Sequence, residues 1–489
     1  MPAVCFCIIA CLSGNVYAAA YYVAPSGNDA SAGTSSAPWS TFARAMKALK
    51  PGDTLYLKDG TYDQQLNVTV SGAKGAYIRI AAVNEGSAIV RTEYPRSSLI
   101  LGTSYIEING INFRNSGIAC SGHISNDCGY KNVHGLNIGG NHDITLRRVT
   151  ANGSSGYNSA VINLTKTQNA LIEDCAASGQ GRVVLNLLGC DNVTVRRCWL
   201  NWSGPDTGGG DTNSISQIYD SSHVLMENNI GLNLTTIPTD GLGIWAHYEN
   251  TTHNTLKGNV VYHTAAYSVG GLGDGAEFGQ HSSYGWFENN VSIVPVKGAY
   301  NSVPAAAMGS DNHTSRNNTY VGSNGIGFFV HERPGRHTQA TTAAIENSSF
   351  VNLWTGIHPS SSGKNKVSRH AYNNYYKVSQ CLYNEGQMDP SKLDPTEKCN
   401  TLDPGYNTAA YGKGAYLMVP TALKGKGMKG GNIGAEVLYR YHDGVLTGKP
   451  LWPWPMENRI VAEFGVSPTW ETKKGIWKTL DGLYPVKKK

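Results

Sequence analysis

Residues that could bind an acidic molecule and remove a proton from it are spread over the middle of the chain. A guanidinium group neutralises a carboxylate through paired hydrogen bonds, and an imidazole or amine can then act as the general base. Strict strand alternation from Asn163 would turn Lys166 inward, so Lys166 is a candidate only if the strand has ended before it. The candidates for neutralising a carboxylate are Arg182 and Arg333, and those for proton abstraction are Lys166, His247 and His331.

Acidic residues offer two further kinds of chemistry in the same region. Carboxylate oxygens near glycines can bind Ca²⁺, and two carboxylates on either side of one bond can hydrolyse it. A lone Asp beside Gly is also ordinary turn chemistry. The candidates for Ca²⁺ are Asp206, Asp211, Asp240, Asp274 and Glu277, of which Asp211, Asp274 and Glu277 are preferred as ligands and Asp240 as a catalytic group; a hydrolase would use Asp211, Asp240 and Asp274.

Amide side chains recur at corresponding places in short apolar stretches. In residues 162–166, 185–188 and 216–219 a polar residue is flanked by largely apolar ones, so it should point away from the core. If these stretches stack in register, their amides form one substrate-binding column, and a second column lies four residues upstream. The first column is Asn163, Asn186 and Gln217, and the second is Ser159, Arg182, Asn213 and Asp240.

These candidates need a scaffold, and an internal repeat predicts one. Short segments of similar pattern recur at intervals of 23 to 31 residues, each with period-2 stretches bounded by Gly, Asn, Asp or Ser. Two or three short strands per repeat are typical of a parallel β-helix, in which stacked coils share one core. The segments are TLRRV (145–149), LIEDC (171–175), TVRRC (194–198), LMENN (225–229), TLKGN (255–259), WFENN (286–290), TSRNN (314–318) and AIENS (344–348).

The last residue of these segments predicts a second kind of column. Side-chain amides stacked at a turn can hydrogen-bond to one another, and stacked cysteines there are either small apolar residues or a disulfide. The predicted column contains Cys175, Cys198, Asn229, Asn259 and Asn290.

The ends of such a stack expose unpaired strand edges that need covers. Residues 40–49 place Phe42, Ala45, Met46 and Leu49 on one helical stripe, which predicts a helix over the first coil, with 54–57 as the first strand. The strand pattern stops near Tyr376. We therefore expect an all-β, right-handed parallel β-helix over 21–380 and an irregular cap or small appendage over 381–489.

The N-terminal block resembles exported right-handed β-helix proteins of the pectate-lyase-like superfamily, as in the chondroitinase B and alginate lyase group. The resemblance implies that long polymers bind on an outward strand face, walled by insertions such as 202–212, 263–283 and 331–342. It implies a polysaccharide lyase acting on a uronate-containing glycan; a hydrolase and a non-catalytic glycan-binding protein remain alternatives. The resemblance rests on Tyr22, Val23, Pro25, Gly27, Asp29, Gly33, Pro38, Trp39, Thr41, Ala45, Pro51, Gly52, Asp53, Gly60 and Tyr62.

Composition and the two ends of the sequence indicate the class of protein, its partners and its location. Gly at 57 residues and charged residues at 15% favour a turn-rich β protein. The net charge of +5 is concentrated after residue 400 without a nucleic-acid-binding motif, so we expect no nucleic acid partner. Residues 1–20 are typical of a signal peptide, and no later stretch suits a membrane span. We expect a secreted monomer, with disulfides plausible at Cys120/Cys128 and Cys381/Cys399.

Overall fold

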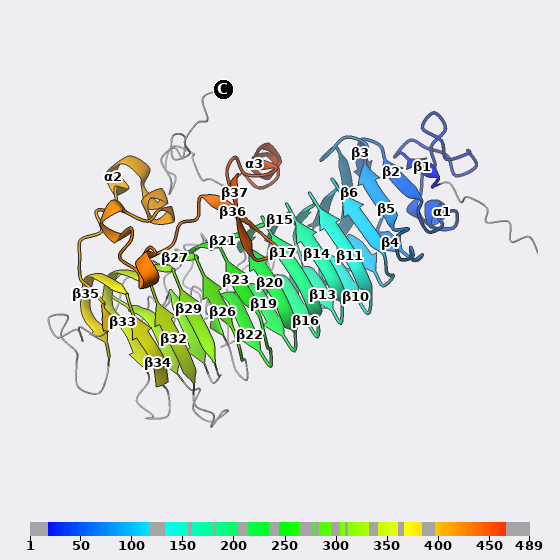
Figure 1. Ribbon diagram of the computed structural model, residues 1–489. Coiled ribbons are helices and arrows are strands. Elements are labelled where there is room, and N and C mark those ends of the chain that lie inside the picture. Colours follow the sequence, from blue (N-terminus) through cyan, green and yellow to red (C-terminus); the bar gives the residue numbers. More distant parts are fainter. Residues whose placement is uncertain are drawn as a thin grey trace, which may run out of the picture.

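The structure, a computed structural model, describes residues 18–116, 133–154, 159–179, 182–202, 214–233, 244–263, 277–278, 283–294, 304–308, 312–331, 341–359, 366–383 and 397–465. Short parallel strands alternate between three sheets and stack into an elongated body (Figure 1). The predicted right-handed parallel β-helix is confirmed.

From β2 (Thr54–Leu57) to β22 (Ile244–Glu249), each coil contributes one strand to each of the sheets A, B and C, in that order. Sheet A contains β1 (Ala20–Val23), β2 (Thr54–Leu57), β5 (Ile78–Ala82), β8 (Ile106–Asn109), β11 (His142–Arg147), β14 (Gln168–Glu173), β17 (Asp191–Arg196), β20 (Ser222–Glu227), β23 (Thr255–Lys257), β26 (Trp286–Glu288), β29 (His313–Arg316), β32 (Thr342–Glu346) and β34 (Lys366–Ala371). Sheet B contains β3 (Gly60–Tyr62), β6 (Ala88–Glu93), β9 (Asn112–Ser116), β12 (Thr150–Asn152), β15 (Ala176–Gly179), β18 (Trp199–Trp202), β21 (Ile230–Asn233), β24 (Val260–His263), β27 (Val291–Ile293), β30 (Thr319–Val321), β33 (Ser349–Pro359) and β35 (Asn374–Leu382). Sheet C contains β4 (Leu66–Val68), β7 (Leu99–Leu101), β10 (Leu136–Gly139), β13 (Ala160–Thr165), β16 (Val183–Leu188), β19 (Ser214–Tyr219) and β22 (Ile244–Glu249). The second half of β33 pairs with β31 (Ile326–His331), on which β28 (Ala305–Met308) and β25 (Glu277–Phe278) stack in turn.

The core is built from inward-facing residues that stack coil upon coil. Alternate positions of each strand face inward, and the parallel register places equivalent positions directly above one another. No single coil could bury these side chains alone, so the stack is stabilised by burial shared between neighbours. One such column consists of Leu146, Ile172, Val195, Met226, Leu256 and Phe287, all buried.

The predicted amide ladder is present at the turn between sheets A and B. The backbone N–H of Cys198 donates to Asn229 Oδ1 (2.9 Å), that of Asn229 to Asn259 Oδ1 (2.9 Å), and that of Asn259 to Asn290 Oδ1 (2.9 Å). The ladder continues beyond the predicted members through Asn318, Ser348, Asn373 and Cys399.

The disulfide predictions are wrong for the cysteines that the structure describes. Among the described residues, Cys175, Cys198, Cys381 and Cys399 form no disulfide. The first two occupy adjacent rungs of the ladder, where each thiol donates to a backbone carbonyl instead. Cys381 faces the core, whereas Cys399 lies at the last rung and accepts the N–H of Asn373 (3.4 Å). Cys120 and Cys128 lie outside the described residues, as do residues 1–17 of the expected signal peptide.

A short helix covers the first coil, as predicted. Helix α1 (Phe42–Met46) buries Phe42, Ala45 and Met46, and Thr41 caps it by accepting the N–H of Arg44. Residues 54–57 form strand β2, but β1 pairs alongside it and is the outermost strand of sheet A. The sequence analysis did not predict β1. Its YYV stretch comes before the capping helix in the chain, and the first strand was expected after that helix.

The C-terminal segment lies lengthwise along sheet B (Figure 1), rather than only over the end of the stack. It contains α2 (Thr408–Tyr411), the 3-10 helices η4 (Lys413–Leu417), η5 (Thr421–Leu423) and η6 (Met428–Gly430), the hairpin β36 (Tyr439–His442) and β37 (Val445–Pro450), and α3 (Glu457–Phe464). We call residues 403–465 the strap. Outward apolar residues of sheet B, such as Trp199 and Ile230, are buried against strap residues that include Leu438 and Trp454. None of the helices in the described part of the chain is long and apolar enough to cross a membrane.

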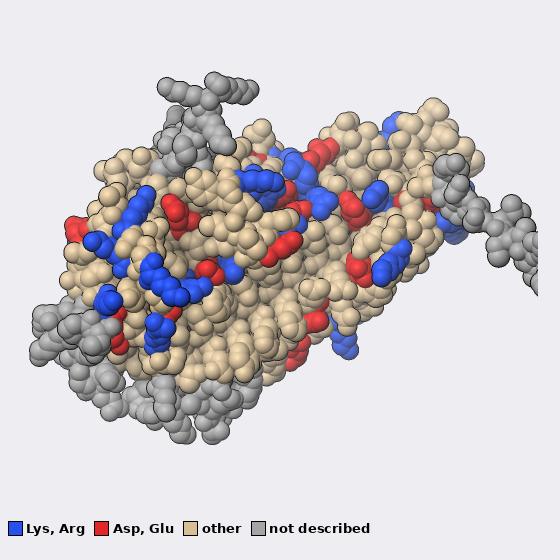
Figure 2. Space-filling view, in the orientation of Figure 1, with Lys and Arg blue, Asp and Glu red and all other residues tan. Residues whose placement is uncertain are grey.

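A column of alternating charge runs along the outer face of sheet A, and acidic and basic side chains are interspersed on the face shown in Figure 2. Arg196 contacts Glu173 (2.7 Å) below it and Glu227 (3.7 Å) above it. Opposite charges therefore lie next to each other on adjacent coils. If a coil paired with its next-but-one neighbour instead, like charges would lie together. The column is Arg147, Glu173, Arg196, Glu227, Lys257, Glu288, Arg316 and Glu346.

The last coil encloses a buried imidazole. The side chain of His370 is 3% exposed, and its Nδ1 lies 2.5 Å from Glu397 Oε2. Its Nε2 contacts the hydroxyl of Tyr375 and lies 3.7 Å from Cys399 Sγ. Burial lowers the pKa of His370, but hydrogen bonds to Cys399 and Glu397 outweigh it and raise this pKa to about 9.

We expect the stability of the protein to fall between about pH 6.5 and pH 9 because of this group. A raised histidine pKa means that the native state keeps a proton that the unfolded chain releases above about pH 6.5. The stabilisation is therefore complete below that pH and is lost as the pH rises through about 9. Melting temperatures of the protein and of a His370→Gln variant across this window test the prediction. Parallel pH curves for the two proteins would contradict it.

Candidate functional site

The outward face of sheet C carries the predicted amide column. The register pairs Asn163 with Asn186 and Asn186 with Gln217, so these residues share one column as predicted. Their strand neighbours, such as Ile162 and Leu164, face the core. Asn137 precedes them in the same column; the sequence analysis missed Asn137, although it also lies between two apolar residues.

Hydrogen bonds connect the first members of this amide column, whereas its last described side chain has a free donor. Asn163 Nδ2 donates to Asn137 Oδ1 (3.0 Å), and Asn186 Nδ2 donates to Asn163 Oδ1 (2.8 Å). Gln217 is 3% exposed, and its Nε2 has no hydrogen-bond partner in the structure. A buried amide N–H without a partner is costly, so Gln217 is a donor that an oxygen of a ligand would satisfy.

His247 follows Gln217 in the amide column. Strand β22 pairs with β19 so that His247 is directly opposite Gln217. The register thus brings one of the predicted bases to the end of the amide column, at the neighbouring coil, about 4.8 Å away in the stacking direction. The structure describes the backbone of His247 and not its side chain.

Arg182 and Lys166 lie at opposite ends of the sheet C strands. Arg182 immediately precedes β16 and its N–H donates to Ser159 O (3.1 Å), so the predicted upstream pair of Ser159 and Arg182 is aligned. Lys166 follows the end of β13 in the left-handed conformation and is exposed. Seven residues of extended chain separate the two levels, or about 20 Å. The structure therefore does not bring Lys166 and Arg182 together.

The remaining predicted site residues are described in part or not at all. His331 pairs with Met308 and Glu277 with Ala306 in the sheet that includes β33, but their side chains are not described. Glu277 belongs to strand β25, so the predicted insertion 263–283 contains a further strand of the stack. Outside the described residues lie Asn213, Asp206, Asp211, Asp240, Asp274 and Arg333.

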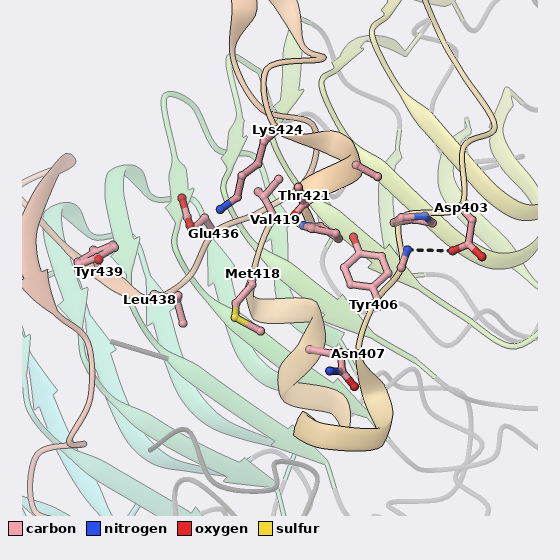
Figure 3. Close-up of a pocket in the computed structure, with 15 residues that line it drawn as sticks. Asp403, Tyr406, Asn407, Met418, Val419, Thr421, Lys424, Glu436, Leu438 and Tyr439 are labelled. Carbon is pink, nitrogen blue, oxygen red and sulfur yellow. Dashed lines mark hydrogen bonds between the residues drawn. The ribbon is translucent and has the colours of Figure 1, made fainter. Parts of the chain in front are cut away.

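A large cavity, with a volume of about 690 Å³, lies in the strap and not on sheet C (Figure 3). One of its two acidic residues, Asp403, accepts hydrogen bonds from Gly405 N (2.8 Å) and Tyr376 OH (3.0 Å). Tyr406 donates to Ser349 Oγ (3.0 Å), and burial raises the pKa of Tyr406 to about 12. Asp403 and Tyr406 already have partners within the protein, whereas Gln217 Nε2 on sheet C has none, so we place the candidate site on sheet C.

Comparisons with known proteins agree with this fold. Residues 21–181 match the family described as Pel9A-like, right handed beta helix region. Pectate lyase L of Dickeya dadantii (strain 3937) is 36% identical over 99 residues, which are 18% of this chain and 23% of that protein. The chain thus spans about a quarter of the length of this curated relative.

Solved structures with a similar fold share little sequence with the chain. Pectate lyase Pel9A has 16% identity and a TM-score of 0.40, over 72% of this chain and 79% of that one. The A-module of the Azotobacter vinelandii mannuronan C-5 epimerase AlgE6 has 12% identity and a TM-score of 0.48, over 72% of this chain and 90% of that one.

Proposed function

Because the chain belongs to the pectate-lyase-like superfamily of right-handed β-helix proteins, we propose that it is an exported enzyme that cleaves a uronate-containing polysaccharide by β-elimination. The polymer binds along the outward face of sheet C. The observation that carries this proposal is the amide column that ends at the unpartnered donor of Gln217, with His247 next in register.

The amide column suits a chain of sugar units. Its amide groups repeat once per coil, about 4.8 Å apart in the stacking direction, and the buried Asn163 holds Asn186 in place by accepting its Nδ2 donor (2.8 Å). Asn186 is only half-buried, which leaves its oxygen available to sugar hydroxyls. Side-chain amides both donate and accept, as recognition of hydroxyl groups requires.

The chemistry assigns one role to each residue near the end of the amide column. Gln217 Nε2 donates to the carboxylate of the uronate unit that reacts, and His247 removes the proton from C5. The C5–H bond breaks, a C4–C5 double bond forms, and the C4–O bond breaks, with the leaving oxygen taking a proton from solvent. Arg182 lies two coils and four residues from His247, or about 16 Å by backbone spacing, so it binds the carboxylate of a neighbouring unit.

Calcium is part of the proposal as an additional source of positive charge. Ca²⁺ bound by Asp211, Asp274 and Glu277 would supply charge that neutralises a substrate carboxylate. Activity that falls in a chelator and returns with added Ca²⁺ supports this role. Activity that is unchanged in a chelator removes the metal from the proposal.

One assay distinguishes the proposed elimination from the alternatives. We expect the protein to generate the ultraviolet absorbance of an unsaturated uronate when it is incubated with uronate polymers. New reducing ends without this absorbance would indicate a hydrolase, and binding without either signal a glycan-binding protein; both outcomes contradict the lyase. An Arg182→Ala variant is expected to raise the KM more than it lowers kcat, because Arg182 binds a neighbouring unit.

A further inference from the structure

A thiol, an imidazole and a carboxylate meet at the C-terminal end of the stack, away from sheet C. Glu397 and Cys399 follow β35 and contact His370 of β34. The carboxylate lies on the Nδ1 side of the imidazole at 2.5 Å, and the thiol on the Nε2 side at 3.7 Å. A thiol on one imidazole nitrogen and a carboxylate on the other is the arrangement that activates a cysteine nucleophile.

We propose that Cys399 is a thiol-modification site that forms a mixed disulfide with low-molecular-weight disulfides. The inference is independent of the proposed lyase activity. Protonated His370 stabilises the Cys399 thiolate, and Glu397 orients and stabilises the imidazolium.

Several groups contact the Cys399 sulfur and the imidazole beside it. The backbone N–H of Asn373 donates to Cys399 Sγ (3.4 Å), and Cys399 Sγ lies 3.8 Å from Glu397 O. Glu397 supplies the negative charge that keeps His370 protonated, since the two atoms are at hydrogen-bonding distance. Tyr375, whose hydroxyl contacts His370 Nε2, holds the ring from the same side as the thiol.

The same ladder provides cysteines without these partners. Cys175 and Cys198 occupy earlier rungs and are 1% and 0% exposed. Their thiols donate to backbone carbonyls, as the Cys399 thiol does to Glu397 O (3.8 Å), but of these three thiols His370 contacts only Cys399. Burial raises the pKa of Cys198 and of Cys190. Cys399 is only half-buried, so a small disulfide can reach it while these buried thiols stay inaccessible.

The reaction is an ordinary thiol–disulfide exchange. The Cys399 thiolate attacks one sulfur of the small disulfide, the original S–S bond breaks, and a new S–S bond joins Cys399 to one half. The other half leaves as a thiolate that takes a proton from solvent. The enlarged side chain can no longer accept the N–H of Asn373 as the small thiol does. The modification therefore disrupts the last rung of the ladder, at the end of the stack.

The test uses the full chain, oxidised glutathione as the probe, and peptide mass mapping. We expect an adduct at Cys399, absent from a Cys399→Ser variant, with no adduct at Cys175, Cys190, Cys198 or Cys381. A His370→Gln variant should form it at least about tenfold more slowly at pH 6, where an unassisted thiol is almost fully protonated. His253→Gln, an exposed histidine on another coil, should leave the rate unchanged.

The pH profile of the unaltered protein gives an independent check if His370→Gln does not fold. A thiolate paired with an imidazolium reacts at a similar rate at pH 6 and pH 8, whereas an unassisted thiol slows about tenfold per pH unit. The unassisted profile, or no adduct at Cys399, would overturn the proposal. So would stoichiometric zinc in the purified protein that the Cys399→Ser variant lacks, because the three side chains would then be metal ligands.

Discussion

A His247→Ala variant is expected to lose elimination activity by about 10²- to 10⁴-fold, the usual contribution of a positioned general base. The reason is that His247 is opposite Gln217 in register, and Gln217 is the donor that we propose for the reacting carboxylate. The initial rate of formation of the unsaturated product measures the effect. Thermal melting of the variant shows whether its fold is kept.

His253→Ala is the matched control for this experiment. His253 lies six residues after His247, but it is exposed just before β23 of sheet A and stacks on Tyr284 with 4.9 Å between ring centroids. Its removal should leave the rate of elimination within a factor of two or so, because it does not face sheet C. Full activity in His247→Ala would remove the amide column of sheet C from the mechanism.

An Asn259→Ala variant is expected to lower the free energy of unfolding by about 3–6 kcal/mol. Asn259 is fully buried, its Oδ1 accepts from the N–H and the Nδ2 of Asn229, and its own Nδ2 donates to Met226 O (2.9 Å) and to Asn290 Oδ1 (2.9 Å). Alanine removes these hydrogen bonds and leaves buried groups of Asn229 and Met226 unpaired. Urea unfolding followed by circular dichroism measures the loss.

Asn67→Ala is the control for the stability measurement. Asn67 is an exposed residue of β4, so its truncation should change the unfolding free energy by no more than about 0.5 kcal/mol. An equal effect of the two substitutions would mean that the amide ladder contributes no more to stability than a solvated asparagine does.

The scaffold could be predicted from the sequence because its determinants are local and repeated. Each coil carries its own alternation of inward and outward residues and its own turn residues, so the register of Asn163, Asn186 and Gln217 follows from short-range patterns. The charge column of sheet A was also visible in the sequence, because the third residue of the aligned repeat segments alternates between basic and acidic from Arg147 to Glu346. We did not predict it, because the repeat was aligned by its turn residues.

Other features depend on contacts between residues far apart in the chain, and only the tertiary structure decided them. The strap covers sheet B because outward residues of that sheet, such as Trp199, are apolar. The periodicity of the sequence does not indicate which segment buries them. The register placed His247 beside Gln217 and separated Lys166 from Arg182. The connecting segments differ in length from coil to coil, so the sequence repeat alone does not give these positions. Cys399 likewise meets His370 and not Cys381, since the coil geometry sets which side chains become neighbours.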